Sequence, residues 1–403
     1  MTRTILHIDM NSYFATVEQQ ANPYLRGKPI GVRGSANKRT IVAAASVEAK
    51  KFGVKTAMSV QEAKETCPEI ILIVGEPRKY SQVTKKFIEI FERYTDKVEI
   101  FSIDEAFLDV TGTMHLFGGA KKIASCIKND LRREIGPWLT CSVGISYNKF
   151  LAKLASDMQK PDGLTIITPG NKDRILLDSK LDDFCGIGPK ILKRLNLLSI
   201  KTVKELRETG DLDLLKEFGI YGLKLKRMAR GIDHAQVTSW RNQSEAKSFG
   251  HSRTLNKDVS SSEELKKHIC LLSEKVATRM RKEQHWCQEI SLWIRLKDFS
   301  HLAKSRKISY WTCSGEDIYR ISLDLLAQLN PTEPVRAIGV RAASTKHARF
   351  IPASLLPEEK KKERLLKTLD MINDKYGFYA IKKARVYDMR IKEVVSGLGR
   401  KKF

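Results

Sequence analysis

Hydrophobic and polar residues alternate along the chain in two series of short segments. The first series predicts a strand, a helix, two strands, a helix and a strand, in that order. Its segments are Thr4–Asp9, Tyr80–Tyr94, Val98–Ile103, Ala106–Asp109, Ala120–Ile135 and Thr140–Ser146. This order is the βαββαβ plan of a ferredoxin-like domain.

Further short elements interrupt the first series between its first strand and its first helix. These elements are Ser12–Gln20, Lys28–Arg33, Arg39–Ala45, Val47–Phe52, Ser59–Thr66 and Ile70–Val74. Gly53 follows one predicted helix and Cys67-Pro68 ends another, as expected for helix stops. Residues 13–78 are therefore expected to form an inserted subdomain.

The second series predicts another βαββαβ domain, with strands at 248–255, 287–297, 302–311 and 335–343 and helices at 260–282 and 315–329. In Glu289–Lys297 apolar and polar residues alternate strictly, so one sheet face should be core and the other basic and open. Between the series, 174–233 reads as short helices broken by glycines, and 234–247 as a linker. The expected fold class is therefore α+β and multidomain. For the tail after residue 350 we expect a helix with an appended strand.

Composition adds a class of ligand to this outline. The chain has 403 residues and 42% hydrophobic residues, which predicts two to four folded domains. Its net charge of +25 is spread along the chain and favours polyanions, with nucleic acid first and an anionic membrane surface second. The alternative is ordinary solvated surface charge, which such a large excess disfavours.

The seven cysteines predict no disulfide framework and no zinc site, because they are scattered and lack metal-ligand spacing. They are Cys67, Cys126, Cys141, Cys185, Cys270, Cys287 and Cys313. The N-terminus does not resemble a signal peptide, and no apolar run is long enough to span a membrane. We therefore expect a cytoplasmic protein without a membrane partner.

Three acidic residues are the candidate chemistry. Asp9 ends an apolar strand, and Asp104-Glu105 lies between two predicted strands with apolar flanks, where an unpaired charge would be costly. Carboxylates on neighbouring strand ends suit two Mg²⁺ ions, which activate a hydroxyl and neutralise a triphosphate during nucleotidyl transfer. The alternative is that Asp104 and Glu105 are solvated turn residues. Asp104 and Glu105 can share a site only if the chain bends between the strands.

The segment GIGPKILKRL predicts a helix-hairpin-helix. Gly186 and Gly188 allow a tight turn whose N–H groups face a phosphate, and Pro189 fits the first turn of the following helix. A plain helix connector is the alternative.

These motifs together resemble the Y-family DNA polymerases, the translesion enzymes of the DNA polymerase IV type. The resemblance begins with IDMNSYFATVEQ and FSIDEAFLDVTG and spans about residues 4–345. Six further motifs match in the family's order, some between these two and some after them: GKPIGV, EAKKFGVKTAMS, CSVGISYNKFLAKLASDMQKPDG, GIGPK, KSFGHSRTL and RAIGVRA. It implies a template-directed, low-fidelity DNA polymerase that extends primers past damaged bases without proofreading.

The resemblance also implies a domain organisation. Residues 1–12 and 79–167 match the palm, 13–78 the fingers and 168–233 the thumb. Residues 234–247 match a linker and 248–346 the little finger, which leaves 347–403 as a tail. The implied partners are primer-template DNA and dNTPs, with the replication sliding clamp as a further candidate, although no clear clamp-binding string is present. A monomer is expected.

The resemblance assigns roles to individual positions. Asp9, Asp104, Glu105 and the backbone carbonyl of Met10 match the ligands of two Mg²⁺ ions, the three acids being the catalytic residues. Phe14 matches the aromatic steric gate under the sugar. The remaining nucleotide-binding positions are Tyr13, Lys50 and Lys160. The DNA-binding positions are Gly186, Gly188, Lys190, Arg295, Lys297, Lys304, Arg306 and Lys307.

One departure from the family pattern concerns the triphosphate pocket. The family commonly has Thr, Tyr and Arg where this chain has Ala44, Val47 and Lys50. Two hydroxyls and a bidentate guanidinium are thus replaced by apolar groups and one ammonium. We expect weaker nucleotide binding than in a relative with the usual residues.

Two other functions remain open. The altered pocket is compatible with a non-catalytic DNA-binding relative that occupies lesions or recruits partners. A nucleotidyl cyclase shares the βαββαβ core and two-metal chemistry, but it would need neither a thumb nor a basic second domain.

Overall fold

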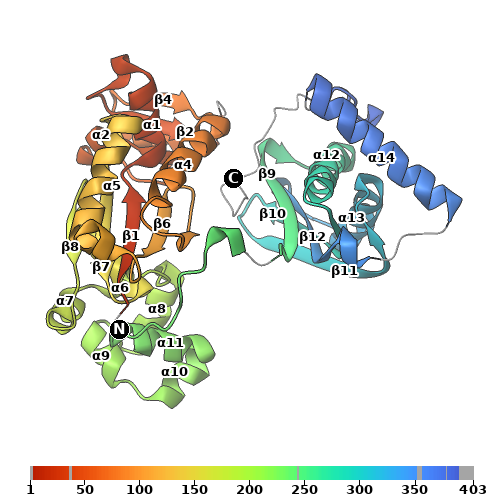
Figure 1. The fold of residues 1–403 in the computed structure, drawn as a ribbon. Helices are drawn as coiled ribbons and strands as arrows, with labels where there is room; N and C mark the ends of the chain where they lie inside the picture. Colours follow the sequence, from red (N-terminus) through yellow and green to blue (C-terminus); the bar gives the residue numbers. More distant parts are fainter. Residues whose placement is uncertain (1–2, 36–38, 243–244, 352–355, 378, 390–403) are drawn as a thin grey trace. The chain divides into compact units, whose positions relative to one another are not determined.

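The computed structural model describes residues 3–35, 39–242, 245–351, 356–377 and 379–389. The chain divides into two compact units, whose described residues are 3–242 and 245–389 with the gaps given above (Figure 1). Each unit is described by itself below.

The centre of the first unit is β1 (Ile5–Met10), every residue of which is buried. It lies in a five-stranded sheet of order β5 (Val98–Ile100), β6 (Glu105–Asp109), β1, β7 (Cys141–Ser146) and β8 (Leu164–Ile166). The first four strands are antiparallel, and β8 runs parallel to β7. With α4 (Pro77–Phe91) and α5 (Ala120–Glu134), this confirms the predicted βαββαβ order. The strand β8 was not predicted.

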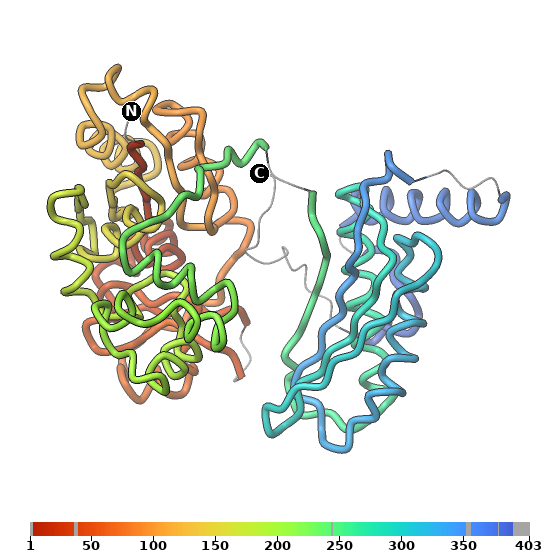
Figure 2. The backbone as a smooth tube through the Cα atoms, turned by 90° about the horizontal axis from the view of Figure 1, so that it is seen from below, coloured from red at the N-terminus to blue at the C-terminus, as the bar shows by residue number. Residues whose placement is uncertain are grey.

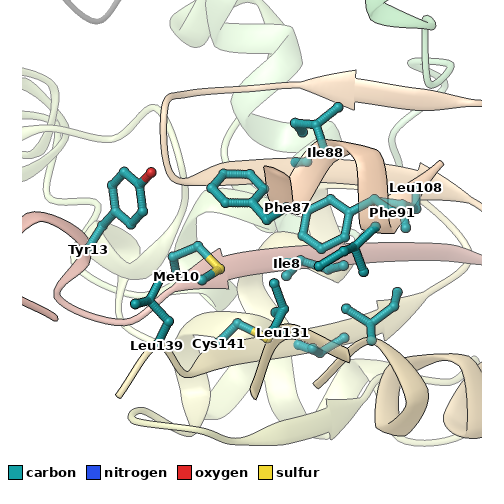
Figure 3. Close-up of a cluster of buried hydrophobic side chains, with 14 of the residues drawn as sticks. Ile8, Met10, Tyr13, Phe87, Ile88, Phe91, Leu108, Leu131, Leu139 and Cys141 are labelled. Atoms are coloured by element: carbon teal, nitrogen blue, oxygen red, sulfur yellow. The ribbon is translucent and has the colours of Figure 1, made fainter. Parts of the chain in front are cut away.

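Alternation along β1 separates a core face from a face that carries chemistry. Leu6, Ile8 and Met10 pack with the apolar side chains of α4 and α5 (Figure 3). Ile5, on the other face, packs near Ala152 of α6 (Lys149–Met158). His7 and Asp9 share that second face because they alternate with the core residues.

The strand predicted over 98–103 ends early. β5 stops at Ile100, residues 101–104 form a bend, and Glu105 is already the first residue of β6. The bend that the two neighbouring acids require is therefore present, with Asp104 inside it and Glu105 at its end.

The segment 13–78 forms the expected insertion, up to the start of α4. It holds a three-stranded sheet of order β3 (Val42–Ala45), β2 (Ile30–Arg33) and β4 (Ile71–Val74). Its helices are α1 (Tyr13–Ala21), η1 (Pro23–Leu25), α2 (Val47–Lys51) and α3 (Val60–Thr66). Ser46 and Ser59 cap α2 and α3 with side-chain hydrogen bonds, which accounts for where these short helices begin.

Short helices follow β8, as predicted for the glycine-broken segment. They are α7 (Lys172–Asp178), η3 (Leu181–Asp183), α8 (Pro189–Leu197), α9 (Val203–Glu208), α10 (Asp211–Phe218) and α11 (Ile220–Ala229). They share a core of buried leucines with residues of α6. Two single-turn helices, η2 (Met114–Phe117) and η4 (Trp240–Asn242), complete the first unit.

The second unit has the predicted βαββαβ order but a different sheet. Its elements are β9 (Ser248–Val259), α12 (Ser262–Lys282), β10 (His285–Leu296), β11 (His301–Thr312), α13 (Gly315–Leu329) and β12 (Val335–His347). The strands run side by side in the order β11, β10, β12, β9 (Figure 2). The first strand of this unit is thus at an edge, whereas β1 is central in its own sheet.

The described part of the tail belongs to the second unit. After η5 (Ala348–Phe350) the chain forms α14 (Pro357–Tyr376), which confirms the predicted helix. The appended strand was wrong, because residues 379–389 contain the single-turn helix η6 (Ala384–Val386) and no strand. Val386 is buried in the core of this unit. Its burial anchors the segment to that core, and Lys383 pairs with Glu274 of α12 and Glu316 of α13.

An ion pair attaches α14 to α12. Arg281 donates to both carboxylate oxygens of Asp370 at 2.6 and 2.7 Å and also to the Cys313 carbonyl at 3.0 Å. Its side chain is only 11% exposed, whereas the neighbouring pair of Lys282 and Asp374 is more than half exposed.

Asp370→Ala should therefore lower the free energy of unfolding by roughly 2 to 3 kcal/mol, because it leaves the Arg281 guanidinium buried without its partner. Asp374→Ala, one helical turn away, should cost less than about 1 kcal/mol. Urea unfolding of the two variants measures the difference. Equal losses would show that α14 does not depend on the buried pair.

Candidate active site

The three candidate acids lie together at one end of β1. Asp9 is directly opposite Glu105 in the pairing of β1 with β6. The Met10 N–H donates to the Asp104 carbonyl at 2.9 Å. The structure therefore brings the two distant sequence segments into one site, as a shared catalytic role requires.

Asp104 is the acid whose negative charge is least neutralised by neighbouring groups. Burial raises the pKa of its carboxyl, and the carboxylates of Glu105 and Asp9 raise it further, while the Ser102 hydroxyl opposes them by donating a hydrogen bond. Three carboxylates in one place repel one another, and a cation between them would relieve that repulsion.

Glu105 is strongly stabilised as an anion. Burial alone would raise its pKa, but the His7 imidazole at 3.1 Å and the Lys153 ammonium at 2.5 Å lower it to about 2. Lys153 comes from α6, and Ser156 of the same helix contacts the other ring nitrogen of His7 at 2.7 Å. The helix α6 thus holds the acid on β6 directly through Lys153 and indirectly through Ser156, which contacts His7 of β1.

Lys160 approaches the site from the loop after α6. Its ammonium lies 2.7 Å from a carboxylate oxygen of Asp9 and 2.7 Å from one of Asp157. Asn11 anchors this loop, since its side-chain amide oxygen accepts from the Asp162 N–H at 2.8 Å and from the Thr140 hydroxyl at 3.1 Å. The loop is thereby tied to the turn that follows β1.

A cavity of about 550 Å³ lies beside these acids. Seven of the sequence-predicted residues line it: Asp9, Met10, Tyr13, Phe14, Lys50, Asp104 and Lys160. Glu105 does not line the cavity, but it contacts Lys153 of a second cavity, which also includes Phe101 and Cys185.

The wall from β3 and α2 is mostly apolar. Ala43, Ala44, Ala45 and Val47 line it and offer no side-chain hydroxyl. Burial lowers the pKa of Lys50, and the ammonium of Lys160 lowers it further, because the two positive charges face one cavity. Such a pair of ammonium groups favours an anion with several charges.

Tyr13 and Phe14 both line the cavity but differ in exposure and in their contacts. The Tyr13 ring is 3% exposed, and its hydroxyl donates to the Tyr80 carbonyl at 2.7 Å, away from the cavity. Thr84, 2.8 Å from the Tyr13 hydroxyl, donates to the Ile103 carbonyl next to Asp104. Tyr13 therefore ties α1 to the acidic bend, while the Phe14 ring is half-buried beside the cavity.

Sequence reasoning missed several residues of the site. Lys51 and Thr56 line the cavity, although only their neighbour Lys50 was predicted. Lys153 and His7 contact Glu105 across the sheet and the helix, which no local pattern indicates. The position of His7, two residues before Asp9 on a buried strand, was the one available signal, because such residues share a face.

Gly186, Gly188 and Lys190 lie together at the start of α8. Gly186 has φ 106°, and an added Cβ would lie 2.6 Å from the hydroxyl of Tyr221, which donates to the Gly186 carbonyl. Gly188 caps α8 and Pro189 is its first residue, as the helix-hairpin-helix interpretation predicted. Lys190 is exposed.

The predicted basic residues of the second unit lie on two faces of its sheet. Along β10, Ile290, Leu292 and Ile294 are fully buried, while Arg295 is partly exposed on the opposite face. Glu289 pairs with Lys307, so Lys307 shares that open face. Lys297 is exposed after the end of β10.

Lys304 and Arg306 are on the face that α13 covers. Arg306 forms an ion pair with Asp324 at 2.8 Å, and Lys304 donates to the Gln328 carbonyl at 3.1 Å. Trp293 was not predicted, but it lies on the open face and contacts His301, to which Arg295 donates a hydrogen bond at 2.9 Å.

Among the described residues, no three side chains of His, Cys, Asp or Glu converge closely enough to hold a metal ion by themselves. None of the described helices is long and apolar enough to cross a membrane.

Lys153→Met should raise the pKa of Glu105, because burial then acts with only His7 to oppose it. In the wild type the lowered pKa means that the carboxylate stabilises the fold above its usual pKa, and this stabilisation is lost as the pH falls toward about 2. In Lys153→Met the loss should begin at higher pH. Carbon NMR titration of the Glu105 carboxyl measures the shift. The control is Lys149→Met, one turn earlier on α6, whose ammonium pairs with Glu99. An unchanged Glu105 pKa in Lys153→Met would contradict the role given to the ammonium.

Comparisons with known proteins agree with one another. Residues 8–157 match the impB/mucB/samB family, and residues 246–350 match the C-terminal domain of that family. DNA polymerase IV of Streptococcus pneumoniae serotype 2 (strain D39 / NCTC 7466) is 42% identical over 345 residues, which cover 84% of this chain and 96% of that protein. DNA polymerase IV of Staphylococcus aureus (strain Mu3 / ATCC 700698) is 39% identical over 349 residues, which cover 86% of this chain and 97% of that protein.

The fold shows the same relationship. A solved Y-family DNA polymerase chimera superposes with a TM-score of 0.76 at 26% identity, over 85% of this chain and 99% of the chimera. The α+β multidomain fold class expected from the sequence is thereby confirmed. The chain therefore belongs to the Y family of DNA polymerases, among the relatives of DNA polymerase IV.

Proposed function

We propose that this DNA-directed DNA polymerase extends primers past damaged template bases with low fidelity and without proofreading, using two Mg²⁺ ions held by Asp9, Asp104 and Glu105. The observation that carries the proposal is the pairing of Asp9 with Glu105, beside Asp104, at the edge of a cavity lined by lysines. The family relationship makes polymerisation of deoxynucleotides the reaction to which this geometry applies.

The residues of the site fit Mg²⁺. Carboxylate and carbonyl oxygens are the ligands that this ion prefers, and it usually binds only one or two carboxylates together with substrate phosphates and water. Asp9, Asp104 and the Met10 carbonyl are placed to supply such oxygens, with Glu105 as the third acid. A bound triphosphate would complete the ligand set, in keeping with the lack of three convergent ligands among the described residues. When bound, the ions would activate the primer hydroxyl and neutralise the departing pyrophosphate.

The cavity has groups for each part of a dNTP. Lys50, Lys51 and Lys160 would neutralise the triphosphate as point charges. Phe14 would lie under the sugar and exclude a ribose 2′-hydroxyl by contact. Lys160 would exchange its present partner, the Asp9 carboxylate, for phosphate oxygens, which frees Asp9 for a cation.

We assign the DNA contacts by exposure. The turn at Gly186 and Gly188 presents backbone N–H groups at the start of α8, where a phosphate binds favourably, with Lys190 beside it. In the second unit Arg295, Lys297 and Lys307 are available from the open side, and Trp293 adds an aromatic surface there. Lys304 and Arg306, with partners on α13, would contribute chiefly long-range charge. Contacts of this kind are independent of sequence, as template-directed synthesis requires.

The domain roles follow from these contacts. Palm, fingers, thumb and little finger are proposed for residues 1–12 with 79–167, 13–78, 168–233 and 248–346, with the linker at 234–247 and the tail at 347–403. Each described domain then has a role in polymerisation, which leaves none for a proofreading nuclease. A sliding-clamp contact, a monomeric state and a cytoplasmic location stay predictions.

Asp104→Ala and Glu105→Ala should each lower primer extension at least about a thousandfold, because each removes a ligand that neutralises charge in the transition state. Asp109→Ala, at the far end of β6, is the matched control and should remain active. Single-turnover extension with Mg²⁺, together with DNA binding by fluorescence anisotropy, separates catalysis from binding. A wild type that binds DNA but extends nothing would favour the non-catalytic alternative.

The triple variant Ala44→Thr, Val47→Tyr, Lys50→Arg should lower KM for dNTPs at least about tenfold, because it restores several hydrogen bonds to a charged group, and a single one of about 1.5 kcal/mol already corresponds to a factor of about ten. Steady-state kinetics on undamaged primer-template measures the change, with the affinity for DNA as the internal control. An unchanged KM would show that Lys51, Thr56 or Lys160 already compensates for the missing groups.

A further inference from the structure

The Phe14 ring has a second aromatic ring behind it. Tyr80 of α4 stacks on Phe14 with 4.4 Å between ring centroids and 30° between ring planes. Phe14 is half-buried beside the cavity, whereas Tyr80 is 3% exposed. Any movement of Phe14 away from the cavity must therefore displace the Tyr80 ring.

A buried carboxylate holds the Tyr80 ring in place. The Tyr80 hydroxyl donates to one oxygen of Glu18 at 2.8 Å, and the Lys79 ammonium lies 2.8 Å from the other oxygen. Glu18 is on α1, one helical turn after Phe14, and is 6% exposed. Gly75 makes room on the other side, since a Cβ there would lie 2.8 Å from the Tyr80 hydroxyl.

We infer that Tyr80 and Glu18 are positioning residues for Phe14 and set how strongly the polymerase rejects ribonucleotides. The inference rests on the proposed gate role of Phe14. An aromatic ring excludes a hydroxyl only if it does not yield when the hydroxyl approaches. The resistance here comes from the stack, and the stack is fixed by the hydrogen bond from Tyr80 to Glu18.

A purely structural role would be to attach α1 to α4. The hydroxyl of Tyr13 already makes that attachment, through the Tyr80 carbonyl and Thr84. These contacts use the backbone at position 80 and a different side chain of α4, so they survive changes to the Tyr80 hydroxyl. The Glu18 carboxylate is therefore available for a role specific to the ring that it holds.

The test compares kcat/KM for a dNTP with kcat/KM for the matching rNTP in one enzyme preparation, so that the fraction of active enzyme cancels. Tyr80→Phe removes the hydroxyl, Tyr80→Leu removes the stack, Glu18→Ala removes the acceptor, and Glu18→Gln retains an acceptor oxygen. Tyr94→Phe is the matched control, because the Tyr94 hydroxyl donates to Asp130 at 2.7 Å in the same unit, away from the cavity.

Tyr80→Phe and Glu18→Ala should each lower the preference for dNTPs about fivefold, as expected for loss of one hydrogen bond that restrains the ring. Tyr80→Leu should lower it more than about tenfold, since both the stack and the restraint are lost. Glu18→Gln and Tyr94→Phe should stay within about twofold of the wild type. Combined with Phe14→Ala, Tyr80→Phe should have no further effect on the preference, because its action passes through the Phe14 ring.

The outcomes separate this inference from the proposed function. If Phe14→Ala itself leaves the preference unchanged, the gate role is wrong and the inference falls with it. If Phe14→Ala admits rNTPs while Tyr80→Leu and Glu18→Ala keep the wild-type preference, only the inference is overturned. Equal effects of Glu18→Gln and Glu18→Ala would overturn the role given to the hydrogen bond.

Discussion

The site depends on the pairing of β1 with β6. Because Asp9 lies opposite Glu105, and the next residue, Met10, is bonded to the Asp104 backbone, the three acids cannot separate without breaking the centre of the sheet. β1 is buried along its whole length, so this pairing is shielded from solvent on the β1 side. The three carboxylates repel one another, but β1 keeps its place because the hydrophobic core holds its other face.

The helix α6 offsets much of that cost. Lys153 lies on it, Lys160 follows it, and both ammonium groups contact acids of the site. Charges at such depth are tolerated when they are paired, and the lowered pKa of Glu105 reflects this pairing. A lysine has a long flexible side chain, so in the proposed function Lys160 can exchange the Asp9 carboxylate for a phosphate without any movement of the backbone. The sheet therefore holds the carboxylates in fixed positions, whereas the lysine ammonium groups that neutralise them can change partner.

Much of this arrangement could be predicted from residue patterns, and the failures have physical reasons. Alternation and apolar runs predicted nearly every strand, and family motifs identified seven residues of one cavity. The strand β8 was missed because three residues are too few for a period to appear. The contact of Lys153 with Glu105 was missed because the pairing joins a helix to a strand 48 positions away. The segment around η6 was expected to form a strand, but Lys383 and Arg385 pair with Glu316 of α13, a distant partner that no local pattern indicates.

The two faces of the second sheet show where charge alone misleads. The β11 residues Lys304, Arg306 and Lys307 are adjacent in a basic run, and their summed charge suggests one DNA-facing surface. Alternation instead directs Lys304 and Arg306 toward α13, where a carboxylate and a helix C-terminal carbonyl receive them, and leaves Lys307 on the other face. A basic strand can thus divide its residues between holding a helix and meeting a polyanion. The alternation of side chains along the strand, and not the number of lysines and arginines, decides which residue contacts the helix and which can contact a polyanion.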